Sequence, residues 1–586
     1  MGSPFILSSF ADGMARFRVA AMTPWSASKL TSLTLAAVLL FSGRGQAQDS
    51  GPIEPARLSQ IVKVLASDEF MGRAPGGPAE QKTLEYIIQQ FKAVGLEPGG
   101  ENGGWTQKVP LVRFQMGDNV TLKLLSGGKT VSLRQGQEVM VNTQRPLQRV
   151  KIDKVPLVFV GYGVSAAERG WDDFKSTDVR GKIAVFLIND PDFEAQEGEA
   201  VRGKFGGQAA TYYARWTYKF EEAARRGAIG ALIVHDTPGA GYGWSTVTAG
   251  NGQSFDIVRA QPEKEKVLMQ GWIHRDAAAA LFARSGLDLE RLKVEARKAS
   301  FKPVLLKGVS LSADYALTHA RADSQNVIGR LPGSKRPQES IMYGGHWDAY
   351  GVGPADASGS TVRHGAVDDA IGIAGMIEIA RAFQQGPRPE RSLVFAAWTA
   401  EEPGLLGSEY YGRHPLQPLD TMVANLTVDI LQTAGLSRDV VLVGHGQNEL
   451  EDALAQAAAR QGRTVTPDAK PERGLFYRAD HFSLAKRGVP VLLLMALGGG
   501  HDLVNGGREA GDRWVADYTA RCYHQPCDAW SDSWDLRGAA QDVQLLYDIG
   551  RELASSDRWP AWKSGSEFKE IRDRSAAARK FVKGSP

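Results

Sequence analysis

The sequence is poor in cysteine, with two in 586 residues, which excludes a disulfide-rich scaffold and a cysteine-rich zinc module. It also lacks an excess of charge of one sign, because 69 Lys and Arg face 66 Asp and Glu and leave a net charge of +3. Nucleic-acid-binding proteins usually show a larger basic excess or a basic stripe, so we expect no nucleic-acid partner. With 43% hydrophobic and 23% charged residues, the composition is that of an ordinary globular protein, not of a disordered one.

Long hydrophobic runs are missing as well. No run reaches the roughly 20 apolar residues that cross a bilayer, so the sequence predicts no membrane span. A short apolar run at 33–41 follows a basic segment and precedes small residues that end at Ala47. This arrangement is typical of a secretory signal peptide, which we assign to residues 1–47, with a disordered cytosolic tail as the alternative. We therefore expect a periplasmic or secreted protein, and the start codon stays open because Met14 and Met22 also precede the apolar run.

The length suggests about three domains, and the pattern of predicted helices and strands changes twice after the signal peptide. Residues 52–149 begin with two amphipathic helices and continue with strands and turns. Residues 150–302 hold short β-rich runs and a helix, which predict a small inserted α/β unit. Residues 303–560 alternate strands with helices, which indicates an open, mostly parallel α/β sheet with helices on both faces. We expect the first and third segments to form one discontinuous domain, followed by a charged C-terminal tail at 561–586.

The third segment carries the clearest periodicity. Apolar residues share one face of a helix predicted over 369–385. The strand candidates are 326–330, 340–343, 392–398, 424–428, 440–443 and 489–495.

Five polar motifs accompany these elements. They are GGHWD at 344–348, GAVDDA at 365–370, TAEEPGLLGS at 399–408, NLTVD at 425–429 and YHQPCD at 523–528. Functional groups of open α/β sheets collect beyond the carboxyl ends of the strands. We therefore expect the polar side chains of the five motifs to converge at one edge of the sheet.

Converging carboxylates repel one another and resist joint burial, so a positive charge must compensate, and the motifs contain no Lys or Arg. Imidazole and carboxylate together suit zinc. Two metal ions that share one carboxylate need that bridge and about two further ligands each. The candidate ligands are His346, Asp368 as the bridge, Glu402, Asp429 and His524.

Taken singly, each of these residues has an ordinary structural alternative. A helix N-cap explains either Asp of the GAVDDA motif, a solvated surface pair explains Glu401 and Glu402, and turn or loop positions explain the others. Their joint occurrence at strand ends favours the metal site.

In this order the motifs resemble those of the co-catalytic zinc exopeptidases, a family that includes bacterial leucyl aminopeptidases, glutamate carboxypeptidase II and the catalytically silent transferrin receptor. The resemblance covers about 52–145 and 305–555. It implies two zinc ions bridged by Asp368. Glu402 and His524 are then expected to complete one coordination sphere. The other sphere is completed by the ligands His346 and Asp429.

The same resemblance implies roles for residues beside the ligands. Glu401 is expected to act as general base, and Asp348 to orient His346, because metal-bound histidine usually needs such a partner. Asp369 departs from several members, which have Asn or Pro there, and we assign it to helix capping. Tyr523 is a candidate hydrogen-bond donor to the oxyanion, with packing as its alternative.

Two further features surround the predicted site. Residues 160–163 (VGYG) and 178–182 (DVRGK) resemble the protease-associated domain inserted in many members of the family. Cys522 and Cys527 flank His524 and are expected to form a disulfide in an oxidising compartment, with two inert thiols as the alternative.

The prediction from these residues is an exported zinc-dependent exopeptidase acting on peptide substrates, most simply an aminopeptidase. A carboxypeptidase is the alternative and needs a cation for the substrate carboxylate, for which Arg478, Lys486 and Arg487 are candidates. A non-catalytic receptor-like protein is disfavoured because all five ligands and the base are present. A glutaminyl cyclase-like acyltransferase with one zinc is disfavoured for the same reason. Side-chain preference, peptide length and oligomeric state stay open.

Overall fold

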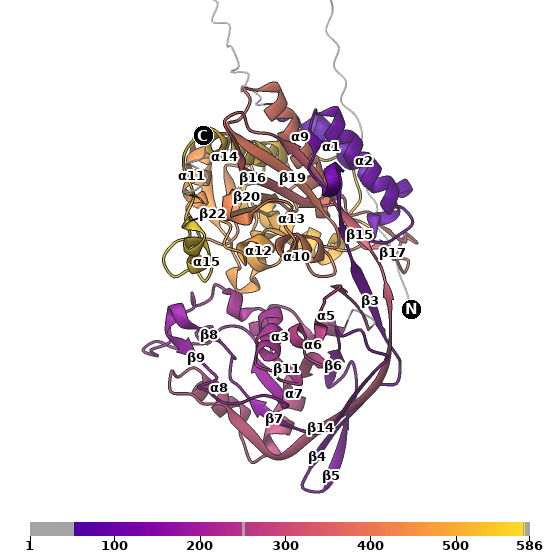
Figure 1. Cartoon of the computed structure of the whole chain (residues 1–586), viewed down its shortest axis with the longest axis vertical. Coiled ribbons are helices and arrows are strands. Elements are labelled where there is room, and N and C mark those ends of the chain that lie inside the picture. Colours follow the sequence, from indigo (N-terminus) through magenta and orange to yellow (C-terminus); the bar gives the residue numbers. More distant parts are fainter. Residues whose placement is uncertain (1–51, 249–251, 578, 580–586) are drawn as a thin grey trace, which may run out of the picture. The chain divides into compact units, whose positions relative to one another are not determined.

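A computed structural model describes residues 52–248, 252–577 and 579 (Figure 1). The segment assigned to a signal peptide, 1–47, lies outside these ranges. Within them, no helix combines the length and apolar character needed to cross a membrane.

The site-bearing part of the chain is built on a seven-stranded sheet in the order β1-β15-β19-β16-β20-β23, with β2 also paired to β15. Strands β19, β16, β20 and β23 run parallel, whereas β15 is antiparallel to β19. The bounds are β1 Glu97–Pro98, β2 Thr106–Val109, β15 Ser324–Leu331, β16 Arg336–His346, β19 Arg391–Trp398, β20 Met422–Val428 and β23 Val491–Leu494. The predicted α/β sheet is confirmed: its parallel strands run from β19 to the edge strand β23, and the antiparallel strands lie at the opposite edge.

One predicted strand lies elsewhere. The strand expected at 440–443 forms as β21 (Asp439–Leu442), but it pairs with β22 (Thr464–Pro467) in a separate two-stranded sheet. It does not extend the main sheet because β23 occupies the position beside β20.

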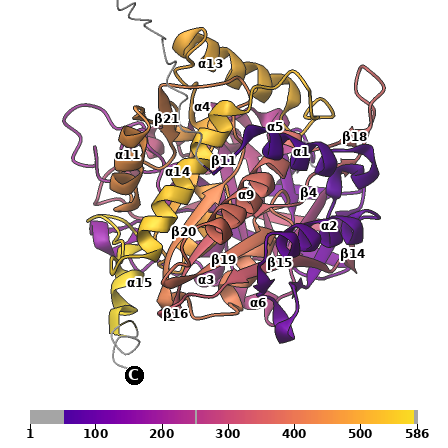
Figure 2. The ribbon, with the colours of Figure 1, turned by 90° about the horizontal axis from the view of Figure 1, so that it is seen from above.

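Helices cover both faces of the main sheet, as predicted, and Figure 2 shows the helices over one of these faces. Side chains alternate between the faces of a strand, so Leu393 and Phe395 of β19 enter one core while Val394 and Ala396 enter the other. Helices α1, α2, α9 and α14 cover the first face, and α10 and α12 the second. Their bounds are α1 Pro55–Leu65, α2 Glu80–Ala93, α9 Ile371–Gln385, α10 Leu406–Arg413, α12 His481–Ala485 and α14 Arg537–Ala554.

Helix α9 begins directly after the predicted bridging aspartate. It contacts α1, α14 and β16, and Ile373, Met376 and Ile377 are buried together with its small residues. A helix that is apolar on most of its circumference must be enclosed by protein. This enclosure holds the N-terminus of α9 firmly at the edge of the sheet.

A second, ten-stranded sheet takes strands from both sides of the range 150–302. Its order is β12-β3-β14-β7-β10-β11-β13-β6, with β4 paired to β14 and β5 paired to β4. The bounds are β3 Leu111–Met116, β4 Thr121–Ser126, β5 Lys129–Leu133, β6 Val139–Asn142, β7 Arg149–Phe159, β10 Ile183–Leu187, β11 Gly230–His235, β12 Gln253–Ile257, β13 Met269–His274 and β14 Val304–Arg321. This sheet therefore reaches from about 111 to 321, because β3 to β6 and β14 supply partners for the strands between them.

The segment after residue 560 packs against the main domain. Trp562, Phe568 and Arg572 are buried, and Arg572, in α15 (Lys569–Arg574), donates hydrogen bonds to the carbonyls of Met422 (3.0 Å) and Val423 (3.3 Å). The beginning of β20 is thus covered by the end of the chain.

Candidate metal centre

The residues proposed as ligands gather at the carboxyl edge of the parallel strands. His346 ends β16, Glu402 follows β19, and Asp429 follows β20 directly. Asp368 precedes α9, and His524 lies in the loop after Cys522. Parallel strands bring their carboxyl ends to one edge, and this geometry unites residues up to 178 positions apart in the sequence.

Asp368 stands between the two histidines. Its Oδ1 lies 3.1 Å from Nε2 of His346, and its Oδ2 lies 3.3 Å from Nε2 of His524. Nε2 of His524 is also 3.3 Å from Oε2 of Glu402, and Nε2 of His346 is 3.9 Å from Oδ1 of Asp429. Each carboxylate oxygen of Asp368 thus faces a separate group of ligand atoms.

These contacts define two overlapping groups with metal-ligand geometry. One contains His346, Asp368 and Asp429, and the other contains Asp368, Glu402 and His524, with the ligand atoms of each within 4.8 Å of one another. The side chain of His346 is 1% exposed and that of His524 is 26% exposed. The second group is therefore the one that solvent can reach.

The donor atoms fit a bound cation. Oδ1 of Asp429 and Nε2 of His524 are buried and make no hydrogen bond to any described residue. A buried polar atom without a partner costs free energy, and both atoms face the centre of their groups. A divalent cation ligated by imidazole nitrogen and carboxylate oxygen would satisfy them.

Electrostatics point the same way. Burial, reinforced by neighbouring carboxylates, raises the pKa of Glu401 and Glu402 well above the ordinary glutamate value, and burial raises the pKa of Asp429 to about 8. Burial alone would raise the pKa of Asp368 too, but the neighbouring imidazoles of His346 and His524 hold that pKa below its ordinary value. Without a cation, Asp429 would be mostly protonated at neutral pH.

Glu401 lies at the centre but in neither ligand group. Its Oε2 is 4.0 Å from Nε2 of His346, and it lines the same pocket as Asp368 and Asp429. A carboxylate that faces the pocket without belonging to a ligand group is free to exchange a proton with a bound water.

Asp348 contacts its neighbours differently from the expected arrangement. Nδ1 of His346 lies 3.0 Å from the main-chain oxygen of Asp348, and 3.7 Å from its carboxylate. The carboxylate instead accepts hydrogen bonds from the backbone N–H groups of Glu401 (3.0 Å) and Glu402 (3.4 Å). Asp348 therefore fixes the ends of β16 and β19 to each other through both its carbonyl and its carboxylate.

Asp369 is a helix cap, as predicted. Its Oδ1 accepts a hydrogen bond from the backbone N–H of Gly372 (3.0 Å) in the first turn of α9. Its Oδ2 accepts one from the N–H of His346 (3.1 Å). The side chain thereby links the start of α9 to the end of β16.

Two residues that support the centre have no role in the sequence prediction. The carboxylate of Asp528 accepts hydrogen bonds from the N–H groups of Val367 (2.8 Å) and Asp368 (3.1 Å) and from the hydroxyl of Tyr518 (3.1 Å). The position of Asp528 at the end of the YHQPCD motif is the feature of the sequence that could have pointed to this role. Asp528 holds the backbone of Asp368 in position.

Arg73 is the second supporting residue, and it lies in none of the five polar motifs of the sequence. Its fully buried guanidinium donates hydrogen bonds of 2.6–2.8 Å to four carbonyls, those of Leu65, Trp347, His364 and Gly365. Burial lowers its pKa to about 10, against the attraction of nearby aspartates, so it stays charged at neutral pH. It supplies the positive charge that the five motifs themselves lack.

A disulfide joins Cys522 and Cys527, as predicted. It closes a short loop that contains Tyr523 and His524, and His524 adopts a left-handed backbone conformation with φ of 63°. The ring of Tyr523 lies 3.6 Å from that of His524, centroid to centroid. The loop thus places Tyr523 in the pocket lining and His524 against Asp368 and Glu402.

Comparison with known proteins agrees with the chemistry of the centre. Residues 326–547 match the model of peptidase family M28. The chain is 37% identical over 113 residues to aminopeptidase NAALADL1 of Mus musculus, and this aligned stretch covers 18% of this chain and 14% of that protein. It is 28% identical over 242 residues to carboxypeptidase Q of Xenopus laevis, covering 41% of this chain and 40% of that protein. The chain thus spans less than half the length of these relatives.

Solved structures of bacterial enzymes are also similar. An aminopeptidase from Aneurinibacillus sp. strain AM-1 is 20% identical, with a TM-score of 0.48 over 87% of this chain and 96% of that one. BSAP, a zinc aminopeptidase from Bacillus subtilis, is 18% identical, with a TM-score of 0.41 over 89% of this chain and 99% of that one.

Proposed function

We propose that this chain, in which residues 326–547 form a peptidase family M28 domain, is an exported aminopeptidase that holds two zinc ions. The observation that carries the proposal is the position of Asp368, whose two carboxylate oxygens face His346 at 3.1 Å and His524 at 3.3 Å. Such an arrangement suits one carboxylate shared between two cations, and the imidazole and carboxylate donors suit zinc.

In this proposal each of the two ligand groups binds one zinc ion. His346 and Asp429 would hold one, Glu402 and His524 would hold the other, and Asp368 would serve both. Bound zinc supplies a water of lowered pKa and polarises the scissile carbonyl. Asp348, Asp369 and Asp528 keep the ligand-bearing backbone in place through the hydrogen bonds described above.

Glu401 acts as general base in this scheme. It takes a proton from the attacking water and returns one to the amine that leaves. The same acidic edge, with Glu401 and Glu402, pairs with the free α-amino group of the substrate, which favours cleavage at the N-terminal residue.

Export is proposed from residues 1–47, which resemble a signal peptide. The disulfide between Cys522 and Cys527 supports the same location, because disulfides persist in oxidising compartments such as the periplasm.

The proposal is tested on the mature chain beginning at residue 48. We expect two zinc ions per chain by elemental analysis, loss of turnover with a chelator and its return with zinc. In a peptide panel, substrates with a free N-terminus should be cleaved and N-terminally blocked ones should not. Cleavage of blocked peptides from the other end would establish a carboxypeptidase instead, and absence of any cleavage would overturn the proposal.

Tyr523 is proposed to donate a hydrogen bond to the oxyanion that forms on the substrate carbonyl. It lines the pocket beside Glu401, and loss of one such donor typically costs about 10²–10³ in kcat. Tyr523→Phe should therefore lower kcat by about 100-fold with little change in KM. The control is Tyr410→Phe, on α10 and outside the pocket-lining residues. An unchanged kcat in Tyr523→Phe would assign the ring to packing alone.

A further inference from the structure

The pocket beside the metal centre combines acidic, apolar and cationic walls. Its acidic part is formed by Asp368, Glu401 and Asp429. Apolar side chains add to it, and they are Ile430, Leu475, Met495 and Leu497. Among the described residues that line this pocket, Arg478 is the one cation. A pocket of this kind can bind a substrate that carries both signs of charge.

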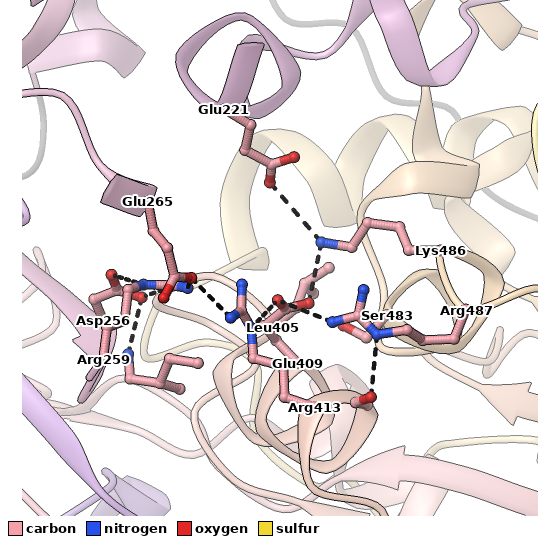
Figure 3. Close-up of polar contacts among 12 residues, drawn as sticks. Glu221, Asp256, Arg259, Glu265, Leu405, Glu409, Arg413, Ser483, Lys486 and Arg487 are labelled. Atoms are coloured by element: carbon pink, nitrogen blue, oxygen red, sulfur yellow. Dashed lines mark hydrogen bonds and ion pairs between the residues drawn. The ribbon is translucent and has the colours of Figure 1, made fainter. Parts of the chain in front are cut away.

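Arg478 differs from the other two cations that the sequence offered for a substrate carboxylate, Lys486 and Arg487, whose acidic partners are drawn in Figure 3. Nζ of Lys486 lies 3.1 Å from Oε2 of Glu409, and Nη2 of Arg487 lies 3.7 Å from Oε1 of the same residue. Lys486 also faces Glu221 at 3.9 Å. Both are therefore neutralised within the protein and neither lines the pocket.

The guanidinium of Arg478 has no such partner. Over the described part of the chain, it forms no ion pair with a carboxylate within 4.0 Å and donates no side-chain hydrogen bond. Its charge reaches Asp429 and Tyr523, which share the pocket. An arginine that borders a substrate pocket without a partner is available to a ligand.

Two more arginines lie close to this one. A side chain built at Gly474 would contact Cδ of Arg215, which places Arg215 against the segment that carries Arg473 and Arg478. Nε of Arg215 is buried and makes no hydrogen bond to a described residue. Burial, followed by the charge of Arg478, lowers the pKa of Arg215 to about 10 and also lowers that of Arg473. The charge of Arg478 therefore repels both of these guanidinium groups.

An anion would relieve this repulsion. A carboxylate accepts two parallel hydrogen bonds from a guanidinium, and a cationic cluster in a partly buried pocket attracts it more strongly than an exposed arginine does. The acidic part of the pocket repels a carboxylate and attracts an amine. A peptide with its α-amino group at the acidic part presents the residue after the scissile bond to the remaining walls.

We propose that Arg478, supported by Arg215 and Arg473, binds a carboxylate on the residue that follows the scissile bond. The substrate class is then peptides with an anionic second residue. Its carboxylate is either the C-terminus of a dipeptide or the side chain of Glu or Asp. This inference rests on the proposed peptidase function and adds a specificity-determining residue to it.

Four substrates distinguish a C-terminal carboxylate from an acidic side chain. Leu-Ala is compared with Leu-Ala amide, and Leu-Glu amide with Leu-Gln amide. Charged hydrogen bonds of this type correspond to about 10- to 100-fold in kcat/KM, and we expect that preference in at least one pair. The first pair identifies a C-terminal carboxylate and the second an acidic side chain. Equal rates within both pairs would overturn the inference, whereas cleavage of none of the four would overturn the proposed function.

Variants assign the preference to the residue. Arg478→Gln should raise KM for the preferred acid by about 10- to 100-fold relative to KM for the matching amide, while Arg478→Lys should keep part of the preference. Arg180→Gln, at an exposed arginine paired with Asp178, is the matched control. If Arg478→Gln does not fold, the wild type provides the test, because its preference should fall as salt is added. A preference that is unaffected by either Arg478→Gln or salt contradicts the inference.

Discussion

Glu401→Gln is expected to lower kcat by about 10²–10⁴-fold while the protein keeps its metal, since this is the range that a positioned general base contributes. The substitution preserves size and removes only the ability to take a proton. Glu401 belongs to neither ligand group, and its backbone N–H, which donates to Asp348, is unchanged. The loss should therefore appear in kcat, with KM nearly constant.

The measurement pairs turnover with metal content on the same preparation. Glu509→Gln is the control, because Glu509 has a side chain that is 85% exposed and pairs with Arg513 on the surface. Near-full turnover of Glu401→Gln would show that the base is another group. Loss of metal would show instead that Glu401 is a ligand.

Asp368→Ala is expected to have the second large effect, on both metal ions together. Its two oxygens are the atoms that face His346 and His524, so its removal takes one ligand from each group. Metal catalysis contributes several kcal/mol of transition-state stabilisation, and turnover should fall by at least about 10³-fold.

Asp429→Ala separates this bridging role from an ordinary ligand role. Asp429 belongs only to the group with His346, so its removal should lower the affinity for one ion and leave the other ion bound. Elemental analysis after dialysis distinguishes the variants, with fewer than one zinc expected for Asp368→Ala and about one for Asp429→Ala if one ion binds per group. Two tightly held ions in Asp368→Ala would refute the shared carboxylate.

The elements of the main domain followed from local pattern. The apolar runs that became β15, β16, β19, β20 and β23 are short and strongly β-prone, and the amphipathic stretch that became α9 is long. Such segments bury the same residues in almost any α/β arrangement, so their type could be predicted from the sequence. The start of the second sheet near β3 could not, because strand partners are chosen by contacts between segments far apart, as between β14 and β3.

The composition of the centre was visible in the sequence for a chemical reason. Carboxylates and imidazoles that follow strands in one sheet must meet at one edge, and buried charges of one sign need a cation. His346, Asp368, Glu402, Asp429 and His524 could therefore be proposed together, although nothing in their spacing sets the distances between them.

What the sequence alone determined is the type of each main-sheet element and the set of side chains able to hold metal, because these depend on periodicity and on chemical identity. Only the tertiary structure decided which long-range partners those side chains have. It placed Arg73 behind the acidic centre and Asp528 on the backbone of Asp368. It also placed Arg478 at the pocket without an acidic partner among the described residues, while Glu409 engaged Lys486. Such pairings join residues that are distant in the chain, and no local pattern encodes them.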